Sequence, residues 1–77
     1  DRYNEYIMTG LRTIWGVDLN RIKTEFGTAT LAYLKKQAQK FLEDGLLSID
    51  DHILKTTIKG KFLTDGIASD LFLLNLE

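Results

Sequence analysis

The apolar positions of the first fifteen residues predict an amphipathic helix. They recur at spacings of three and four, which is the period of a helix with one buried face. The residues of this stripe are Tyr3, Ile7, Met8, Leu11, Ile14 and Trp15. We expect Gly16 to supply the left-handed residue that ends this helix.

Two further helices follow with the same period. Asp18 has the position of an N-cap, because its carboxylate can accept hydrogen bonds from the free N–H groups of a new first turn. Gly27 closes this second helix, whose stripe is Leu19, Ile22 and Phe26. We expect Thr28 or Thr30 to cap the third helix and Gly45 to end it. Its stripe is Leu31, Leu34, Ala38, Phe41 and Leu42.

The period then changes to two. Leu47 and Ile49 alternate with polar neighbours, and a second β-branched stretch covers residues 53–58. Between them, Asp50-Asp51-His52 is typical of a turn, so this region predicts a β-hairpin. We expect Gly60 to break the second strand.

A fourth helix is predicted at the C-terminal end. Its stripe is Leu63, Ile67, Leu71 and Leu74, and its other sides carry Phe72, Leu73 and Leu76. A helix that is apolar on more than one side is normally buried. We therefore expect part of it to pack on another domain or on a second copy of the chain.

The order α-α-α-β-β-α predicts a mainly helical winged-helix fold with one small β-hairpin. Two short helices joined by a tight turn with Gly indicate a helix-turn-helix unit, and the hairpin supplies the wing. A lone hairpin is marginal in water, so it must pack on the helices. With 77 residues, the chain is expected to form a single domain over residues 1–77.

Composition excludes several kinds of chemistry. The chain has no cysteine, which removes disulfides, thiol catalysis and thiolate metal sites. A net charge of -1 argues against a dedicated nucleic-acid-binding domain, which is usually basic. No apolar run reaches the roughly 20 residues of a bilayer span, and no signal-peptide pattern opens the chain. Because the sequence starts at Asp1 rather than Met, we expect it to be part of a longer protein.

Several separated motifs occur in an order found in one known family. They are Glu5, Met8, Gly10-Leu11-Arg12, Gly16-Val17-Asp18, Phe26-Gly27, Asp44-Gly45-Leu46-Leu47, and Thr57, Lys59 and Gly60. Through them the sequence resembles the C-terminal domain of the oxygen-independent coproporphyrinogen III oxidases, which are radical S-adenosylmethionine proteins. Asn4 before Glu5 is similar to the haem-chaperone-like branch, whereas Thr56 stands where the family usually has Leu.

The resemblance implies an accessory domain without catalysis of its own. The family's barrel carries a Cys-x3-Cys-x2-Cys motif for a 4Fe–4S cluster, which reduces S-adenosylmethionine to a radical that begins decarboxylation of porphyrinogen propionates. A cluster needs thiolate ligands, and none of those cysteines is in this chain. By resemblance, the domain packs on the barrel and helps to enclose a porphyrinogen or haem. The parent is expected to be a cytoplasmic oxidoreductase of the coproporphyrinogen dehydrogenase type or a haem chaperone.

Four residues are candidates for an interdomain or substrate-facing surface: Glu5, Arg12, Trp15 and Asp18. Glu5 and Arg12 return to almost the same side of a helix. Arg12 could bind the barrel or a substrate carboxylate, or the two could be structural, with Glu5 favouring the helix dipole and Arg12 binding a neighbouring loop. The structural or interdomain role is favoured. Gly10 costs about 1 kcal/mol inside a helix relative to Ala, which predicts close approach of another helix.

His52 and Met8 are the only candidates for metal or haem ligation. His52 is the sole histidine and lies beside Asp50 and Asp51. Three adjacent residues rarely converge on one ion, so we expect an exposed turn residue, and a core residue for Met8. We predict no catalytic, cofactor-binding or metal-binding residue in this chain.

A DNA-binding winged helix of a transcription regulator is the alternative. Its basic face would consist of Lys35, Lys36, Lys40, Lys55, Lys59 and Lys61, with Gln37 and Gln39 reading base edges. Nearby acidic residues would repel phosphates: Glu43, Asp44, Asp50 and Asp51. A solvated helix face is therefore favoured. A free-standing enzyme is the third option, and it lacks a visible nucleophile–base pair or metal cluster.

Overall fold

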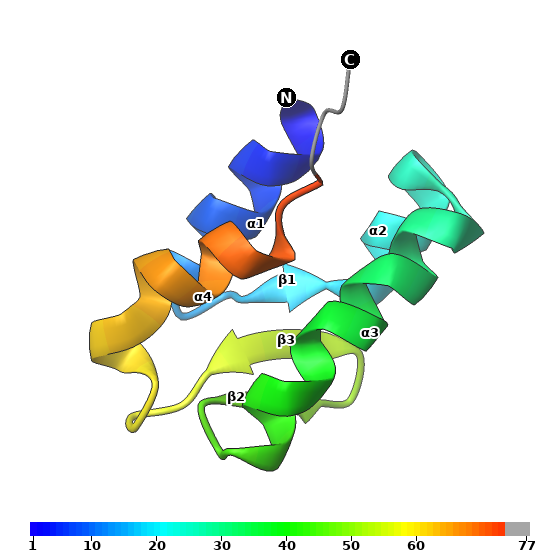
Figure 1. Cartoon of the computed structure of the whole chain (residues 1–77). Helices are drawn as coiled ribbons and strands as arrows, with labels where there is room; N and C mark the ends of the chain where they lie inside the picture. Colours follow the sequence, from blue (N-terminus) through cyan, green and yellow to red (C-terminus); the bar gives the residue numbers. More distant parts are fainter. Residues whose placement is uncertain (74–77) are drawn as a thin grey trace.

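The computed structural model describes residues 1–73, which form helices and a small antiparallel sheet (Figure 1). The elements are α1 Arg2–Arg12, β1 Val17–Asp18, α2 Leu19–Phe26, α3 Thr28–Glu43, β2 Leu47–Asp50, β3 Ile53–Thr56, the 3-10 helix η1 Lys61–Leu63, and α4 Thr64–Leu71. The predicted class is confirmed, and the order fits a winged-helix-like arrangement. Leu74 and Leu76, predicted in the last helix, lie outside the described residues.

The sheet contains a strand that periodicity did not predict. Its order is β1-β3-β2, and both pairings are antiparallel. The predicted hairpin of β2 and β3 is confirmed, with Leu47 opposite Thr56. β1 lies on the other side of β3, with Val17 opposite Leu54. This third strand ties the hairpin to the entrance of α2 and offsets the weakness of an isolated two-stranded ribbon.

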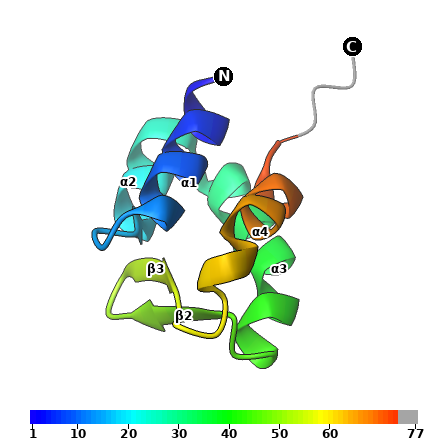
Figure 2. The same cartoon turned by 90° about the vertical axis from the view of Figure 1, so that its left-hand side faces the viewer.

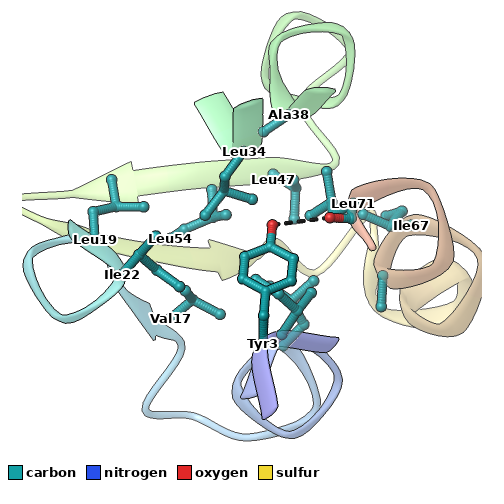
Figure 3. Close-up of a cluster of buried hydrophobic side chains, with 13 residues drawn as sticks. Tyr3, Val17, Leu19, Ile22, Leu34, Ala38, Leu47, Leu54, Ile67 and Leu71 are labelled. Carbon is teal, nitrogen blue, oxygen red and sulfur yellow. Dashed lines mark hydrogen bonds between the residues drawn. The ribbon is translucent and has the colours of Figure 1, made fainter. Parts of the chain in front are cut away.

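One apolar core lies between the helices and the sheet (Figure 3). Its members are Tyr3, Ile7, Leu11, Val17, Leu19, Ile22, Leu34, Ala38, Leu47, Leu54, Ile67, Ala68 and Leu71. Most of them come from the predicted stripes, because one buried face per element is what each stripe encodes. Met8 and Phe26 pack against this core and are only partly buried.

α1 ends at Arg12, earlier than the stripe predicted. Thr13 is the C-cap, and its N–H donates to the Gly10 carbonyl at 3.2 Å. Ile14 and Trp15 therefore lie in a loop and are exposed, so the prediction that they continue the buried stripe is wrong.

The early end follows from a tight return of the chain across Gly10. A β-carbon on Gly10 would lie 2.7 Å from both the Gly16 carbonyl oxygen and Val17 Cγ2. The neighbour that Gly10 accommodates is thus this returning chain rather than another helix. Gly16 has the predicted left-handed backbone, with φ of 72°, but it lies in the return and not at the helix end.

The junctions around α2 were only partly predicted. The Asp18 carboxylate caps α2 as expected, accepting from the N–H groups of Asn20 and Arg21 at 2.9 and 3.3 Å. Gly27 ends α2 as expected. A threonine cap for α3 is wrong, because Gly27 is also the residue before α3 and Thr28 is already helical. A junction of one residue leaves no position for a separate cap.

α4 is shorter than predicted. It ends at Leu71, and Phe72 has an extended backbone with φ of -66° and ψ of 149°. The prediction that Phe72 and Leu73 belong to a helix is therefore wrong. Both side chains are partly buried against the core.

Three polar side chains hold residues 71–73, which we call the exit segment. Tyr3 O–H donates to the Leu71 carbonyl at 2.9 Å, the bond drawn in Figure 3. Tyr33 O–H donates to the next carbonyl at 2.6 Å. The Asn4 side chain accepts from the last N–H of the segment at 2.9 Å and donates to that residue's carbonyl at 3.4 Å. The exit segment is thereby fixed to the first turn of α1 and to α3.

Candidate interdomain surface

Five large apolar side chains are exposed at one end of the molecule. They come from the loop after α1, the loop before η1, and η1 itself: Ile14, Trp15, Ile58, Phe62 and Leu63. Their exposed fractions lie between 53% and 96%. Figure 2 views the molecule from this side, with the loop after α1 and the η1 segment toward the reader. We call these five residues the apolar rim. Large apolar side chains exposed together on one side of a domain indicate a candidate interaction site.

A groove of about 490 Å³ runs between the end of α1, β3 and the start of α4. Ile14 and Ile58 of the apolar rim line it, and its charged residues are Arg12, Lys55, Lys61 and Asp65. A second groove beside it is lined by Phe62 and Leu63 and shares Lys61, Thr64 and Asp65 with the first. The two grooves therefore lie next to each other.

Arg12 lies in this groove and pairs with α4. Its Nε and Nη2 atoms donate to the same oxygen, Oδ1 of Asp65, at 3.1 and 3.0 Å. The Arg12 and Asp65 side chains are 56% and 70% exposed. An ion pair this exposed contributes little to folding, about 0–1 kcal/mol. The expected structural contact of Arg12 with a neighbouring loop is replaced by one with the first turn of α4.

The other candidate residues are spread over the molecule. Glu5 is in the first turn of α1 and Arg12 is in its last turn, and the two residues line different grooves. Trp15 lies on the apolar rim and lines a small neighbouring groove with Tyr6 and Ile53. Asp18 serves α2 as its cap. Of the four candidates, the structure thus places Arg12 and Trp15 at the rim end.

Tyr6 supports the rim from behind and was not anticipated from the sequence. The Asp18 N–H donates to its hydroxyl oxygen at 2.9 Å. The guanidinium of Arg21 lies 4.5 Å from its ring centroid, a cation–π distance. A hydrogen bond with Glu25 raises the pKa of Arg21, so this cation stays charged. Tyr6 falls outside the apolar stripe, and its partners lie 12 and 15 residues away, so local periodicity carries no signal for it.

His52 and Met8 do not form a site together. His52 Nδ1 is 3.1 Å from Asp51 Oδ2 at the hairpin turn, and Nε2 is 3.8 Å from Asp18 Oδ1. His52 lies in the turn as predicted, and it is half-exposed rather than fully exposed. Met8 lies on α1 beside Phe72. Within residues 1–73, no three His, Cys, Asp or Glu side chains are placed to hold a metal ion.

The basic face of the DNA-binding alternative is divided by the fold. Lys40 pairs with Asp70 at 3.5 Å, and Lys59 donates to the Asp44 carbonyl at 3.0 Å. Lys55 and Lys61 line the groove of Arg12 instead of extending the exposed face of α3. The alternative of duplex DNA binding through α3 thus receives no specific support from the geometry.

Comparisons with known proteins address the family directly. A family model described as the HemN C-terminal domain matches residues 1–63. Neither the comparison with curated proteins nor that with solved structures gives a match. None of the helices within the described residues is long and apolar enough to cross a membrane. The match covers most of the 77 residues and confirms the resemblance seen in the motifs. The chain belongs to the HemN C-terminal domain family, the C-terminal domain of HemN-type oxygen-independent coproporphyrinogen III oxidases.

Proposed function

We propose that this domain packs through its apolar rim on the catalytic barrel of the same polypeptide and helps to enclose the tetrapyrrole. It contributes no catalysis of its own. The observation that carries the proposal is the exposure of five large apolar side chains at one end of a domain whose core is otherwise closed. The family match supports the partner, because the domain belongs to HemN-type proteins.

The energetics favour a covered rim. Burying a large apolar side chain yields about 1.5–3 kcal/mol, and aromatic side chains are frequent anchors of protein interfaces. Trp15 and Phe62 are two such side chains on this rim. Neither side chain packs in the core of the domain, because both lie outside the core cluster.

The parent's chemistry resides elsewhere in this proposal. The barrel would hold the 4Fe–4S cluster and S-adenosylmethionine, because a cluster needs thiolate ligands and the chain has no cysteine. The proposed role is the same whether the parent is an oxidase or a haem carrier. The proposed location of the parent is the cytoplasm. The location rests on the family alone.

Amide hydrogen exchange in the intact parent tests the proposal. The exchange rate at residues 13–15 and 57–63 is measured in the parent and in this chain alone. We call the rate in the isolated chain divided by the rate in the parent the docking factor. We expect slower exchange in the parent, since a docked surface must open before its amides exchange. Phe62→Ser should reduce the docking factor by tenfold or more, at about 1.4 kcal/mol per tenfold.

Ile49→Ser is the matched control, because Ile49 is exposed on β2 and outside the rim. It should leave the docking factor unchanged. Porphyrinogen turnover or haem retention by the parent is measured alongside and should fall with Phe62→Ser only. Equal exchange in the parent and in the isolated chain would refute the proposal.

A further inference from the structure

We propose that the groove inside the apolar rim receives a carboxylate side chain of the catalytic domain. This carboxylate replaces Asp65 as the ion-pair partner of Arg12. This inference rests on the proposed function, since it describes the chemistry of the same docking surface. It assigns to the partner an acidic side chain flanked by apolar ones. Asp65 becomes an internal counter-ion that holds Arg12 until docking.

The first observation is a separation of charge. The groove is lined by three cations, Arg12, Lys55 and Lys61, and by a single carboxylate, Asp65. Its net charge is therefore +2, although the whole chain carries -1. Charge complementarity across an interface favours a partner of the opposite sign.

The second observation is the geometry of the Arg12 pair. Both of its contacts end on one oxygen of Asp65, whereas a bidentate pair would use both carboxylate oxygens. Exposed pairs of this kind are worth about 0–1 kcal/mol, so exchange of one carboxylate for another costs little. Arg12 is thus held in place but remains available.

The third observation concerns the uncharged polar groups of the groove. The hydroxyls of Thr13, Thr56 and Thr64 donate to backbone carbonyls of the domain, those of Gly10, Leu11 and Lys61. The Thr57 hydroxyl likewise donates to a backbone carbonyl, so the side-chain donors of the groove that remain for a ligand are the cationic ones. Such a donor set selects an anion over a neutral polar group.

The flanking residues define the rest of the partner. Ile14 and Ile58 stand on the walls of the groove and are largely exposed. Covering them lowers the local dielectric, which strengthens an ion pair between Arg12 and the incoming carboxylate. An acidic side chain between apolar neighbours satisfies both requirements at once.

The docking factor of the intact parent provides the test, with each variant referred to the same variant of the isolated chain. Lys55→Glu combined with Lys61→Glu should lower the factor by about fivefold or more, the equivalent of at least one exposed pair. Raising the ionic strength from about 0.05 to about 0.5 M should lower it as well. Lys35→Glu combined with Lys36→Glu makes the same charge change on α3 and should leave the factor unaltered.

Asp65→Asn gives the decisive result. If Asp65 competes with the partner's carboxylate, its neutralisation should raise the docking factor by about two- to fivefold. Arg12→Gln should lower it. Two results would overturn this inference: a docking factor that the lysine reversals do not change, or one that Asp65→Asn lowers. If Phe62→Ser still lowers the docking factor in that case, the proposed function stands. No docking in the unaltered parent would instead refute the proposed function.

Discussion

The two ends of this small domain use their side chains in opposite ways. At the exit segment, Tyr3, Asn4 and Tyr33 direct their polar atoms to the backbone of the last described residues. No buried side-chain nitrogen or oxygen in the described part of the chain lacks a hydrogen-bond partner. At the rim end, large apolar side chains are exposed, and the Arg12–Asp65 ion pair is open to water.

This difference separates residues that fold the domain from residues available to a partner. Folding a 77-residue chain leaves little stability to spare. Large apolar side chains that remain in water at one end therefore contribute nothing to that stability. The same kind of substitution should therefore change the free energy of unfolding differently at buried positions and on the rim.

The sharpest test is a matched pair of isoleucines. Ile7 is fully buried in α1, and Ile58 on the rim is 90% exposed. Ile7→Ala should cost about 2–5 kcal/mol, the range for removing a buried branched side chain and leaving a cavity. Ile58→Ala should stay within about 0.5 kcal/mol. Urea unfolding of the isolated chain measures both, and similar losses would erase the distinction between the two ends.

Two helical glycines give a second pair. Gly10→Ala forces a β-carbon against the Gly16 carbonyl, where backbone cannot easily move, and should cost about 1–3 kcal/mol. Gly66 lies in α4, and a β-carbon added there would meet no atom within 4 Å beyond its chain neighbours and the nearby backbone of its own helix. Gly66→Ala should therefore stabilise the domain by about 0.5–1 kcal/mol. Thermal unfolding should show the two melting temperatures moving in opposite directions.

Tyr3→Phe probes the closed end through its pH dependence. Burial raises the pKa of the Tyr3 hydroxyl, so the folded state retains its proton at pH values where the unfolded chain has lost it. Stability from this group is complete below about pH 10, the pKa of an unfolded tyrosine, and falls as the pH rises further. Tyr3→Phe should cost about 1 kcal/mol at about pH 7.

The variant should also flatten the loss of stability above about pH 10. Urea unfolding at a series of pH values from about 7 to about 11 reads out both effects. If the variant and the unaltered chain lose the same stability at alkaline pH, that loss comes from other groups. Tyr33→Phe is the control, because it removes a hydroxyl that is only partly buried.

Sequence reasoning identified the elements of the fold better than their ends. Each apolar stripe encodes one buried face, so the helices and the hairpin were predicted from local pattern. A stripe cannot show that the chain turns back over Gly10, which is why Ile14 and Trp15 were predicted to continue the stripe of the first helix. β1 has two residues and is too short to alternate detectably.

The residues of the candidate surface could be predicted from the sequence only in part. Arg12 belongs to a family motif, and Trp15 was a candidate from the predicted helix stripe. Both lie at the rim end, where their role stays a prediction. Asp65 and Phe62 were not chosen, since Asp65 meets Arg12 across 53 positions and Phe62 has no periodic neighbour to reveal its exposure. Contacts between distant residues depend on how the elements pack, and a single sequence does not encode them locally.

Asp18→Ala tests whether a residue that stabilises the fold also orders the rim, and it has the smallest expected effect. The Asp18 carboxylate caps α2, while its N–H donates to Tyr6 behind the rim. Loss of the side chain should cost about 1 kcal/mol, as for other N-caps, and Asp18→Asn should cost less because an amide oxygen can still accept. The backbone bond to Tyr6 survives both changes, so exchange at residues 13–15 of the isolated chain should remain as it was. Faster exchange there in Asp18→Ala alone would mean that the cap of α2 also holds the rim, so that the order of the rim depends on a residue that stabilises the fold.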